Sequence, residues 1–388
     1  MRTFGKWLGR ILLMLILAIA VVYVWKRDQV NRLYSVVTLY DANKIVGNFS
    51  GMNLAFPNTE IDRGTGPVHA LAQGPSATMP DAFDTWVTDR TVTSLVVLKD
   101  GALVHESYYQ GTTDTDRRMS FSVAKSFLSA LFGVVVSDGQ ITSLDDPVTK
   151  YAASLKGSAY DGASIKNVLQ MSSGVLFDED YLAFSSDINR MSRVLALGGS
   201  MDGFTEDLRA TFTTPGAQWK YVSIDTHVLS MVIRGATGRD IAALMSEKII
   251  APLGLEQAPY YITDGDGVAF VLGGLNLRTR DYARFGQMFL QNGMLDGHQI
   301  VPADWVTAST QASAKTAPGK IGYGYQWWIP VDATAGEFLG RGIYGQYIYV
   351  NQPLGIVIAS TAADRLFRES GVHSANIAMF RAIAASAQ

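Results

Sequence analysis

The chain has 388 residues, of which 48% are hydrophobic and 17% charged, so it can bury the core of one large domain or two smaller ones. Its formal net charge is −3 and no block of like charge stands out, which does not favour nucleic acid as a partner. The absence of cysteine excludes disulfides, thiolate metal sites and a cysteine nucleophile. We expect neither a metal nor another cofactor, because the histidines are scattered without metal-ligand spacing: His69, His105, His227, His298 and His373.

The N-terminus contains an apolar segment with basic flanks. Three basic residues within the first ten positions precede an uncharged run from Ile11 to Trp25, and Lys26 and Arg27 follow it. With the neighbouring residues 7–9, the segment approaches the roughly 20 residues that a membrane-spanning helix needs. Residues 1–27 are therefore predicted to form a single-pass anchor in the inner (cytoplasmic) membrane.

Cleavage of this segment is the alternative. Ala18-Ile19-Ala20 fits a signal-peptidase site, which would give a secreted protein. The apolar run continues past this site to Trp25, and Trp7, Tyr23 and Trp25 lie where interfacial aromatic residues belong. We therefore expect an uncleaved anchor. The basic residues before the run favour a cytoplasmic N-terminus and a catalytic domain on the periplasmic, extracytoplasmic side.

The elements that follow begin with a weakly patterned stretch. Residues 28–78 are predicted to be a tether and lead-in made of loops that pack on a domain covering 79–388. Two strands, 94–99 and 102–106, are joined by Asp100-Gly101, which predicts a hairpin. A helix is expected from about Phe121 through Val135.

The rest of the chain predicts a helical insertion and a return to strands. Residues 140–290 read as mostly helical, ending in a helix over 279–290 with Thr279 as its cap. Strands are expected at 345–350 and 355–360, and a last helix at 374–385. Strands at both ends with helices between them predict an antiparallel sheet closed by distant parts of the chain.

Ser122-Val123-Ala124-Lys125 carries the central chemical hypothesis. At positions i and i+3 of a helix, Ser122 and Lys125 can meet on one face. Apolar neighbours and the positive end of the helix dipole both lower the pKa of such a lysine, and a neutral amine can take the serine proton. Backbone N–H groups near the helix start can bind the oxyanion of acyl transfer. A surface lysine beside a capping serine would give the same four letters, so this motif needs support.

Two further segments support the hypothesis that Ser122 and Lys125 are catalytic. Tyr221 follows the Pro215-Gly216 turn next to Lys220, an arrangement that could stabilise a phenolate and relay protons. A packed tyrosine whose hydroxyl is satisfied is the alternative. The glycines of Leu339–Gln346 could allow a close backbone approach to a ligand and an oxyanion donor, or could mark only a bulge.

Together these motifs resemble the serine hydrolases of the class C β-lactamase superfamily. The shared order is S-x-x-K, then Tyr-x-Ser or Tyr-x-Asn about 100 residues later, then a glycine-containing strand, and the likeness extends over roughly residues 93–360. Within the superfamily, Gln326-Trp327-Trp328, Gly342–Gln346 and Asp178–Tyr181 look like 6-aminohexanoate-dimer (nylon-oligomer) hydrolases and related esterases. The resemblance implies an α/β (α+β) fold of the β-lactamase and penicillin-binding-protein type, with a central antiparallel sheet flanked by helices and a mostly helical subdomain.

The resemblance also implies roles for individual residues. Ser122 is the nucleophile, Lys125 the base and Tyr221 the proton relay, with the backbone N–H groups of Ser122 and Ile343 as oxyanion donors. The residues expected to contact a small amide or ester substrate are Tyr181, Ser223, Gly340, Gly342, Gln346 and Trp327.

The third motif departs from the pattern of penicillin-active enzymes. They usually carry Lys or His, then Thr or Ser, then Gly, where this chain has Gly340-Arg341-Gly342, and strand alternation should point Arg341 to the other face. Amide or ester hydrolysis is therefore favoured over the alternatives, which are a β-lactamase, a D,D-peptidase and a non-catalytic exported binding module.

Overall fold

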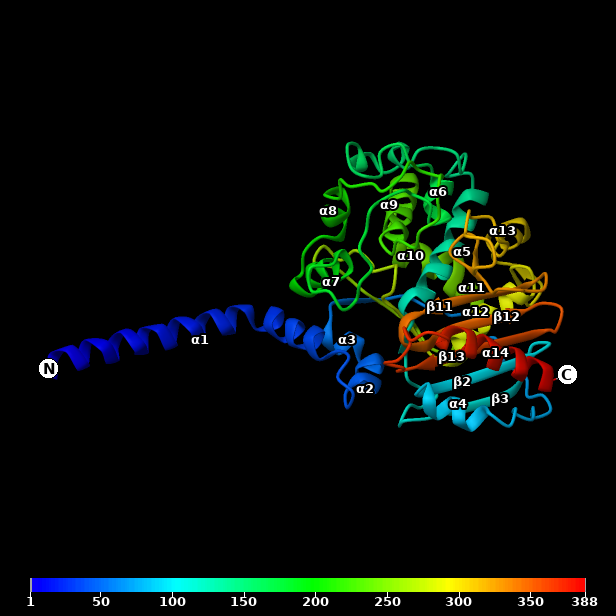
Figure 1. The fold of residues 1–388 in the computed structure, drawn as a ribbon, viewed down its shortest axis with the longest axis horizontal. Helices are drawn as coiled ribbons and strands as arrows, with labels where there is room; N and C mark the ends of the chain where they lie inside the picture. Colours follow the sequence, from blue (N-terminus) through cyan, green and yellow to red (C-terminus); the bar gives the residue numbers. More distant parts are fainter. Residues whose placement is uncertain (1, 388) are drawn as a thin grey trace.

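A seven-stranded antiparallel sheet forms the centre of the protein, whose computed structural model describes residues 2–387 (Figure 1). The strand order β3-β2-β13-β12-β11-β10-β9 sets the first hairpin beside the last strand, so distant parts of the chain close the sheet, as the sequence predicted. The strands are β2 (Val92–Lys99), β3 (Ala102–Tyr108), β9 (Gly322–Tyr323), β10 (Trp328–Ile329), β11 (Glu337–Gly342), β12 (Gln346–Asn351) and β13 (Ile356–Ala362).

The β2–β3 hairpin turns where Asp100-Gly101 predicted it. Both residues have positive φ, 49° for Asp100 and 84° for Gly101, as a two-residue turn matching the strand twist requires. Lys99 pairs with Ala102 across this turn. The dipeptide therefore fixes the register of the sheet edge.

Alternate residues of β2 enter two different cores. Leu95 and Val97 join one apolar cluster, whereas Val96 and Leu98 join the other. The first cluster lies under helices α4 and α14, and the second under α5 and α12, so the sheet is covered on both faces. The bounds of these helices are α4 (Phe83–Asp89), α14 (Val372–Ser386), α5 (Ala124–Ser137) and α12 (Thr279–Leu290).

A mostly helical subdomain stands over one end of the sheet, at the top of Figure 1. Its elements are η2 (Val148–Lys150), η3 (Ala153–Leu155), α6 (Ile165–Leu169), α7 (Asp187–Leu197), α8 (Met201–Glu206), α9 (Asp225–Thr237), α10 (Ile241–Met245), the π-helical turn η4 (Ser246–Ile250) and α11 (Ala251–Leu253). Short strands and one helix complete the fold: β4 (Arg118–Met119), β5 (Tyr260–Ile262), β6 (Leu275–Leu277), β7 (Met294–Leu295), β8 (His298–Gln299) and α13 (Ala303–Ser309).

Helix α12 differs from expectation in two respects. Although it falls within the range predicted for the helical insertion, it packs on strands of the central sheet. Thr279 is its first residue rather than its cap; Arg278 occupies the cap position and makes no side-chain cap. The Thr279 hydroxyl instead lies 2.7 Å from that of Ser94, which ties the helix to β2.

The first 61 residues are more structured than predicted. Helix α1 runs from Arg2 to Thr38 and is followed by α2 (Ile45–Ser50), α3 (Met52–Ala55) and β1 (Asn58–Glu60), which pairs with β5. The expectation of loops was wrong for residues 28–61, where Phe49, Met52 and Ile61 are buried in the larger core, whereas residues 62–78 form loops as expected. Within the described chain, α1 is a helix long and apolar enough to cross a membrane; a signal sequence would have the same features.

Candidate active site

Ser122 lies at a sharp turn between helix α5 and a small second sheet of strand order β1-β5-β6-β4. The short helix η1 (Phe121–Val123) carries it, and the N–H of Ser120 donates to the carbonyl of Leu275 on β6 at 2.8 Å. Phe121 has a φ of 43°, a left-handed conformation that costs a non-glycine residue energy and persists only where the surroundings hold it. The turn leaves Ser122 partly exposed, at the wall of a cavity.

Lys125 contacts the nucleophile from one turn further along the helix. Its Nζ lies 3.2 Å from Ser122 Oγ and donates to the carbonyl of Leu272 at 2.6 Å. Only 2% of Lys125 is exposed. Burial lowers the pKa of Lys125 to about 7, although the charges of Glu179 and Asp225 raise it. A neutral amine within hydrogen-bond reach of a serine hydroxyl is suited to take its proton.

Glu179 is a partly buried carboxylate that the sequence reasoning did not single out. It accepts hydrogen bonds from the backbone N–H of Ser223, from Ser223 Oγ at 3.0 Å and from Tyr181 Oη at 3.4 Å. Burial raises the pKa of Glu179, while the Ser223 N–H and the charge of Lys125 lower it. Ser223 and Tyr181, both predicted as substrate contacts, are thus held together by one carboxylate, and both line the cavity.

Tyr221 faces the nucleophile, but its protonation differs from the prediction. Burial, and secondly the charge of Glu179, raise the pKa of Tyr221 far above its usual range, although hydrogen bonding to Ser122 and Ser223 lowers it. Lys220 gives no help, because its Nζ donates to the carbonyl of Phe177 at 3.1 Å. The phenolate hypothesis is therefore wrong: Tyr221 is a neutral phenol at neutral pH, fit to donate a proton rather than to remove one.

Trp328 supports this tyrosine from β10. Its ring stacks on Tyr221 with centroids 5.2 Å apart, and the guanidinium of Arg341 lies 5.5 Å from the Trp328 ring centre. The neighbours of Arg341 face the other way: Gly340 faces helix α5 and Gly342 faces the turn at the start of η1. Arg341 therefore points away from α5, as strand alternation predicted.

The glycines of β11 serve the approach of the strand to η1 and α5. A Cβ on Gly342 would lie 2.6 Å from the carbonyl oxygen of Ser120, and one on Gly340 would lie 3.3 Å from Ser126 Oγ. The backbone of the protein itself, rather than a ligand, needs this space. The close approach brings Ile343 to the wall of the cavity that Ser122 also lines, which fits the predicted pair of oxyanion donors without testing it.

Two other predicted substrate contacts lie in the interior. Trp327 is fully buried and packs against Phe285, Phe289 and Phe338, so a substrate contact does not fit its position. Gln346 is 2% exposed, and its Nε2 donates to the carbonyls of Ile343, Tyr344 and Ala362. Gln346 thus holds the turn that presents Ile343.

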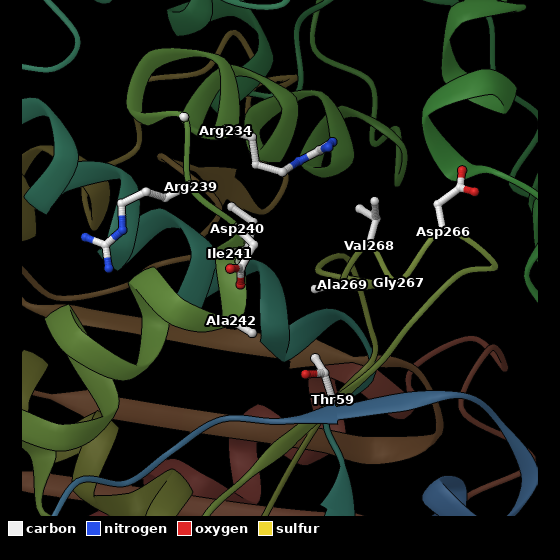
Figure 2. Close-up of a pocket in the computed structure, with 11 residues that line it drawn as sticks. Thr59, Arg234, Arg239, Asp240, Ile241, Ala242, Asp266, Gly267, Val268 and Ala269 are labelled. Atoms are coloured by element: carbon white, nitrogen blue, oxygen red, sulfur yellow. The ribbon is translucent and has the colours of Figure 1, made fainter.

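Ser122, Ile343, Tyr181 and Ser223 share one cavity of about 540 Å³. A second cavity, of about 530 Å³, lies beside the start of α10 (Figure 2). Its lining includes the two arginines whose guanidinium groups point in different directions in Figure 2, and each is paired: Arg234 with Asp202 and Arg239 with Glu247, both at 2.6 Å. No serine or lysine is among the described residues that line it, so we assign the active site to the cavity at Ser122.

Comparison with known proteins agrees with this geometry. Residues 83–375 match the Beta-lactamase family, and the chain belongs to this family. It is a serine hydrolase of the β-lactamase and penicillin-binding-protein type, as the sequence motifs predicted.

Among its relatives are several hydrolases. It is 28% identical over 284 residues to the 6-aminohexanoate-dimer hydrolase of Paenarthrobacter ureafaciens, covering 70% of this chain and 72% of that enzyme. A Bacillus anthracis protein provisionally assigned as a 6-aminohexanoate-dimer hydrolase superposes with a TM-score of 0.76 at 23% identity, over 89% of this chain and 95% of the other. An octameric penicillin-binding protein homologue from Pyrococcus abyssi gives 0.56 at 20% identity, over 77% of this chain and 76% of the other.

Three parts of the site escaped the sequence reasoning. Glu179 stands in a segment that was singled out only for Tyr181, and its burial is a tertiary property. Trp328 was passed over for its neighbour Trp327, which lies just before β10 and is buried in the core. Tyr40, directly after α1, stacks on Tyr344 with centroids 4.8 Å apart, a contact between segments about 300 residues apart that no local pattern signals.

Proposed function

We propose that this protein hydrolyses a small amide or ester through an acyl-enzyme on Ser122. The observation that carries the proposal is the buried Lys125 amine 3.2 Å from Ser122 Oγ. Burial keeps a large fraction of this amine neutral near pH 7, and the hydroxyl has a base within reach. The similarity to 6-aminohexanoate-dimer hydrolase supports amides as substrates.

The reaction has two steps. Ser122 Oγ attacks the carbonyl carbon while its proton passes to Lys125, and the oxyanion accepts hydrogen bonds from the N–H groups of Ser122 and Ile343. The carbon–nitrogen or carbon–oxygen bond then breaks. Tyr221 gives a proton to the leaving group and regains one from the Lys125 ammonium, so no net charge remains in the buried site. Water attacks the acyl-enzyme by the same route and releases the acid.

Labelling with a fluorophosphonate probe, followed by mass spectrometry of the modified peptide, tests the proposal. Wild type should be labelled on Ser122 and should hydrolyse p-nitrophenyl acetate, whereas Ser122→Ala should show neither reaction. Ser126→Ala is a matched control, since Ser126 lies one turn further on with its Oγ bonded to the carbonyl of Gln326 at 2.8 Å. An unlabelled wild-type protein would show a binding module instead. Stable acylation of Ser122 by a fluorescent penicillin would indicate a penicillin-binding enzyme.

We propose further that α1 remains attached as a membrane anchor, with the catalytic domain on the extracytoplasmic side. Arg32, in the last part of α1, donates from Nε to the carbonyl of Ala196 at 3.1 Å, so the helix continues into contacts with the domain. Basic residues before the apolar run support a cytoplasmic N-terminus. Protease added to spheroplasts should digest the domain. Protection until lysis would contradict this orientation, and an N-terminus mapped after Ala20 would show cleavage.

A further inference from the structure

The catalytic cavity is apolar over much of its wall. Several lining residues come from α1, the segment after it, α3 and α7, rather than from the elements that carry the catalytic groups: Val36, Leu39, Met52, Phe56, Met191 and Leu195. Apolar walls of this kind bind apolar groups, because a polar ligand would lose hydrogen bonds to water there. The cavity therefore fits a substrate whose carbonyl group is attached to an extended hydrocarbon portion.

The helix that forms part of this wall is also the candidate membrane span. Val36 lies ten residues beyond Lys26, where the uncharged run has ended. At 1.5 Å per residue, that separation is about 15 Å along α1. Because α1 is continuous from Arg2 to Thr38, a bilayer around its apolar run would lie a short distance from the cavity.

The surface of the domain on this side carries exposed apolar side chains. Leu54 is 89% exposed, Leu182 85%, Phe184 78% and Val37 72%. Figure 1 shows α3, which contains Leu54, and α7, which begins shortly after Phe184, on the side of the domain from which α1 extends. Leu182 also lines the cavity, so exposed apolar surface continues into the site. Exposed apolar groups of this kind mark a contact surface, here towards a lipid phase.

We propose that the substrate of Ser122 is an ester or amide with a long apolar chain, drawn from the membrane that carries α1. The apolar chain of the substrate lies between the end of α1 and α7, while the substrate carbonyl reaches Ser122. This inference rests on the proposed function and names its substrate class.

The first test measures chain-length preference with the full-length protein in phosphatidylcholine vesicles. Each methylene that becomes buried should raise kcat/KM about fourfold, so p-nitrophenyl octanoate should exceed the butyrate on the order of 100-fold. Val36→Arg should remove most of this advantage, measured within the variant as the ratio of kcat/KM for octanoate to that for butyrate. Asn31→Arg is the matched control, because Asn31 is an exposed polar residue of α1 that does not line the cavity.

The outcomes separate this inference from the proposed function. Acetate hydrolysis without a preference for octanoate would overturn the substrate class and leave the proposed function standing. If the wild-type protein hydrolyses none of these esters, the proposed function is overturned. An octanoate preference that survives Val36→Arg would reflect partition into lipid and would also overturn the inference. If Val36→Arg lowers acetate hydrolysis through misfolding, the same measurement is made on Ser192→Phe, which should also lose the preference for octanoate. Ser192 is a partly exposed cavity residue on α7.

A second test examines the source of the substrate. A dodecanoyl ester placed in the same vesicles as the protein should be hydrolysed at least tenfold faster than the same ester in separate vesicles at equal total concentration. Equal rates in the two arrangements would show that the substrate arrives through water and would refute access from the bilayer.

Discussion

The pH dependence of the reaction should report the state of Lys125. Its pKa changes from 10.5 to about 7 on burial, a difference of about 5 kcal/mol between the two protonation states. About half of the amine is then neutral at pH 7, against on the order of one part in 3,000 for an exposed lysine. Because the neutral form is the base, kcat/KM for p-nitrophenyl acetate should rise with pH through about 7 and level off above about 8.

Glu179→Gln provides the control for this assignment. The charge of Glu179 favours the ammonium form of Lys125, so its removal should shift the rising limb to lower pH, by about 1 pH unit. The glutamine oxygen can still accept from Ser223. The assay is a profile from about pH 5 to about pH 9.5, with stability checked at each pH by thermal unfolding. The assignment of Lys125 as a buried base would be refuted if kcat/KM of the wild type rises only near pH 10, or if the rise shifts to higher pH in Glu179→Gln.

Four further substitutions separate packing from catalysis. Trp327→Ala should lower the free energy of unfolding, measured in urea titrations, by about 3–5 kcal/mol. Trp328→Phe should instead lower kcat/KM and leave the midpoint of urea unfolding nearly unchanged. Gly342→Ala should lower kcat at least tenfold in a folded protein, checked by circular dichroism, since its Cβ would meet the carbonyl of Ser120; full activity would contradict the role of β11 in shaping the site. Phe49→Leu should reduce both the melting temperature and kcat, because Phe49 packs on Phe121 and Tyr344, the neighbours of the two predicted oxyanion donors. A change in the melting temperature alone would show a purely structural role.

Local patterns predicted the parts of the fold that local chemistry determines. Asp100-Gly101 encodes its own turn, and the continuous apolar run within β2 fits a sheet covered on both faces. The S-x-x-K motif predicted the contact of Ser122 with Lys125, because helical geometry alone brings those positions together.

The errors arose where distant segments decide the outcome. The stretch after α1 has weak periodicity and was expected to be loops, yet Phe49 is held by Phe121 and Tyr344, which lie far along the chain. Trp327 and Trp328 could not be told apart by composition. Gln326, directly before them, has a left-handed φ of 65°, and the strand β10 begins only at Trp328, so no regular alternation extends through both tryptophans.

Phe121 and Tyr344 share a strained backbone conformation that bears on the stability of the enzyme. Each adjoins a predicted oxyanion donor and has a left-handed backbone, with φ of 43° and 59°. Such residues cost about 1–3 kcal/mol each, and here their rings lie 5.6 Å apart. Glycine at either position would relieve the backbone but remove the ring that keeps the turn in place. Because truncating a buried phenylalanine costs about 3–5 kcal/mol, more than the strain that glycine would relieve, selection for thermal stability alone would retain Phe121 and its strained turn.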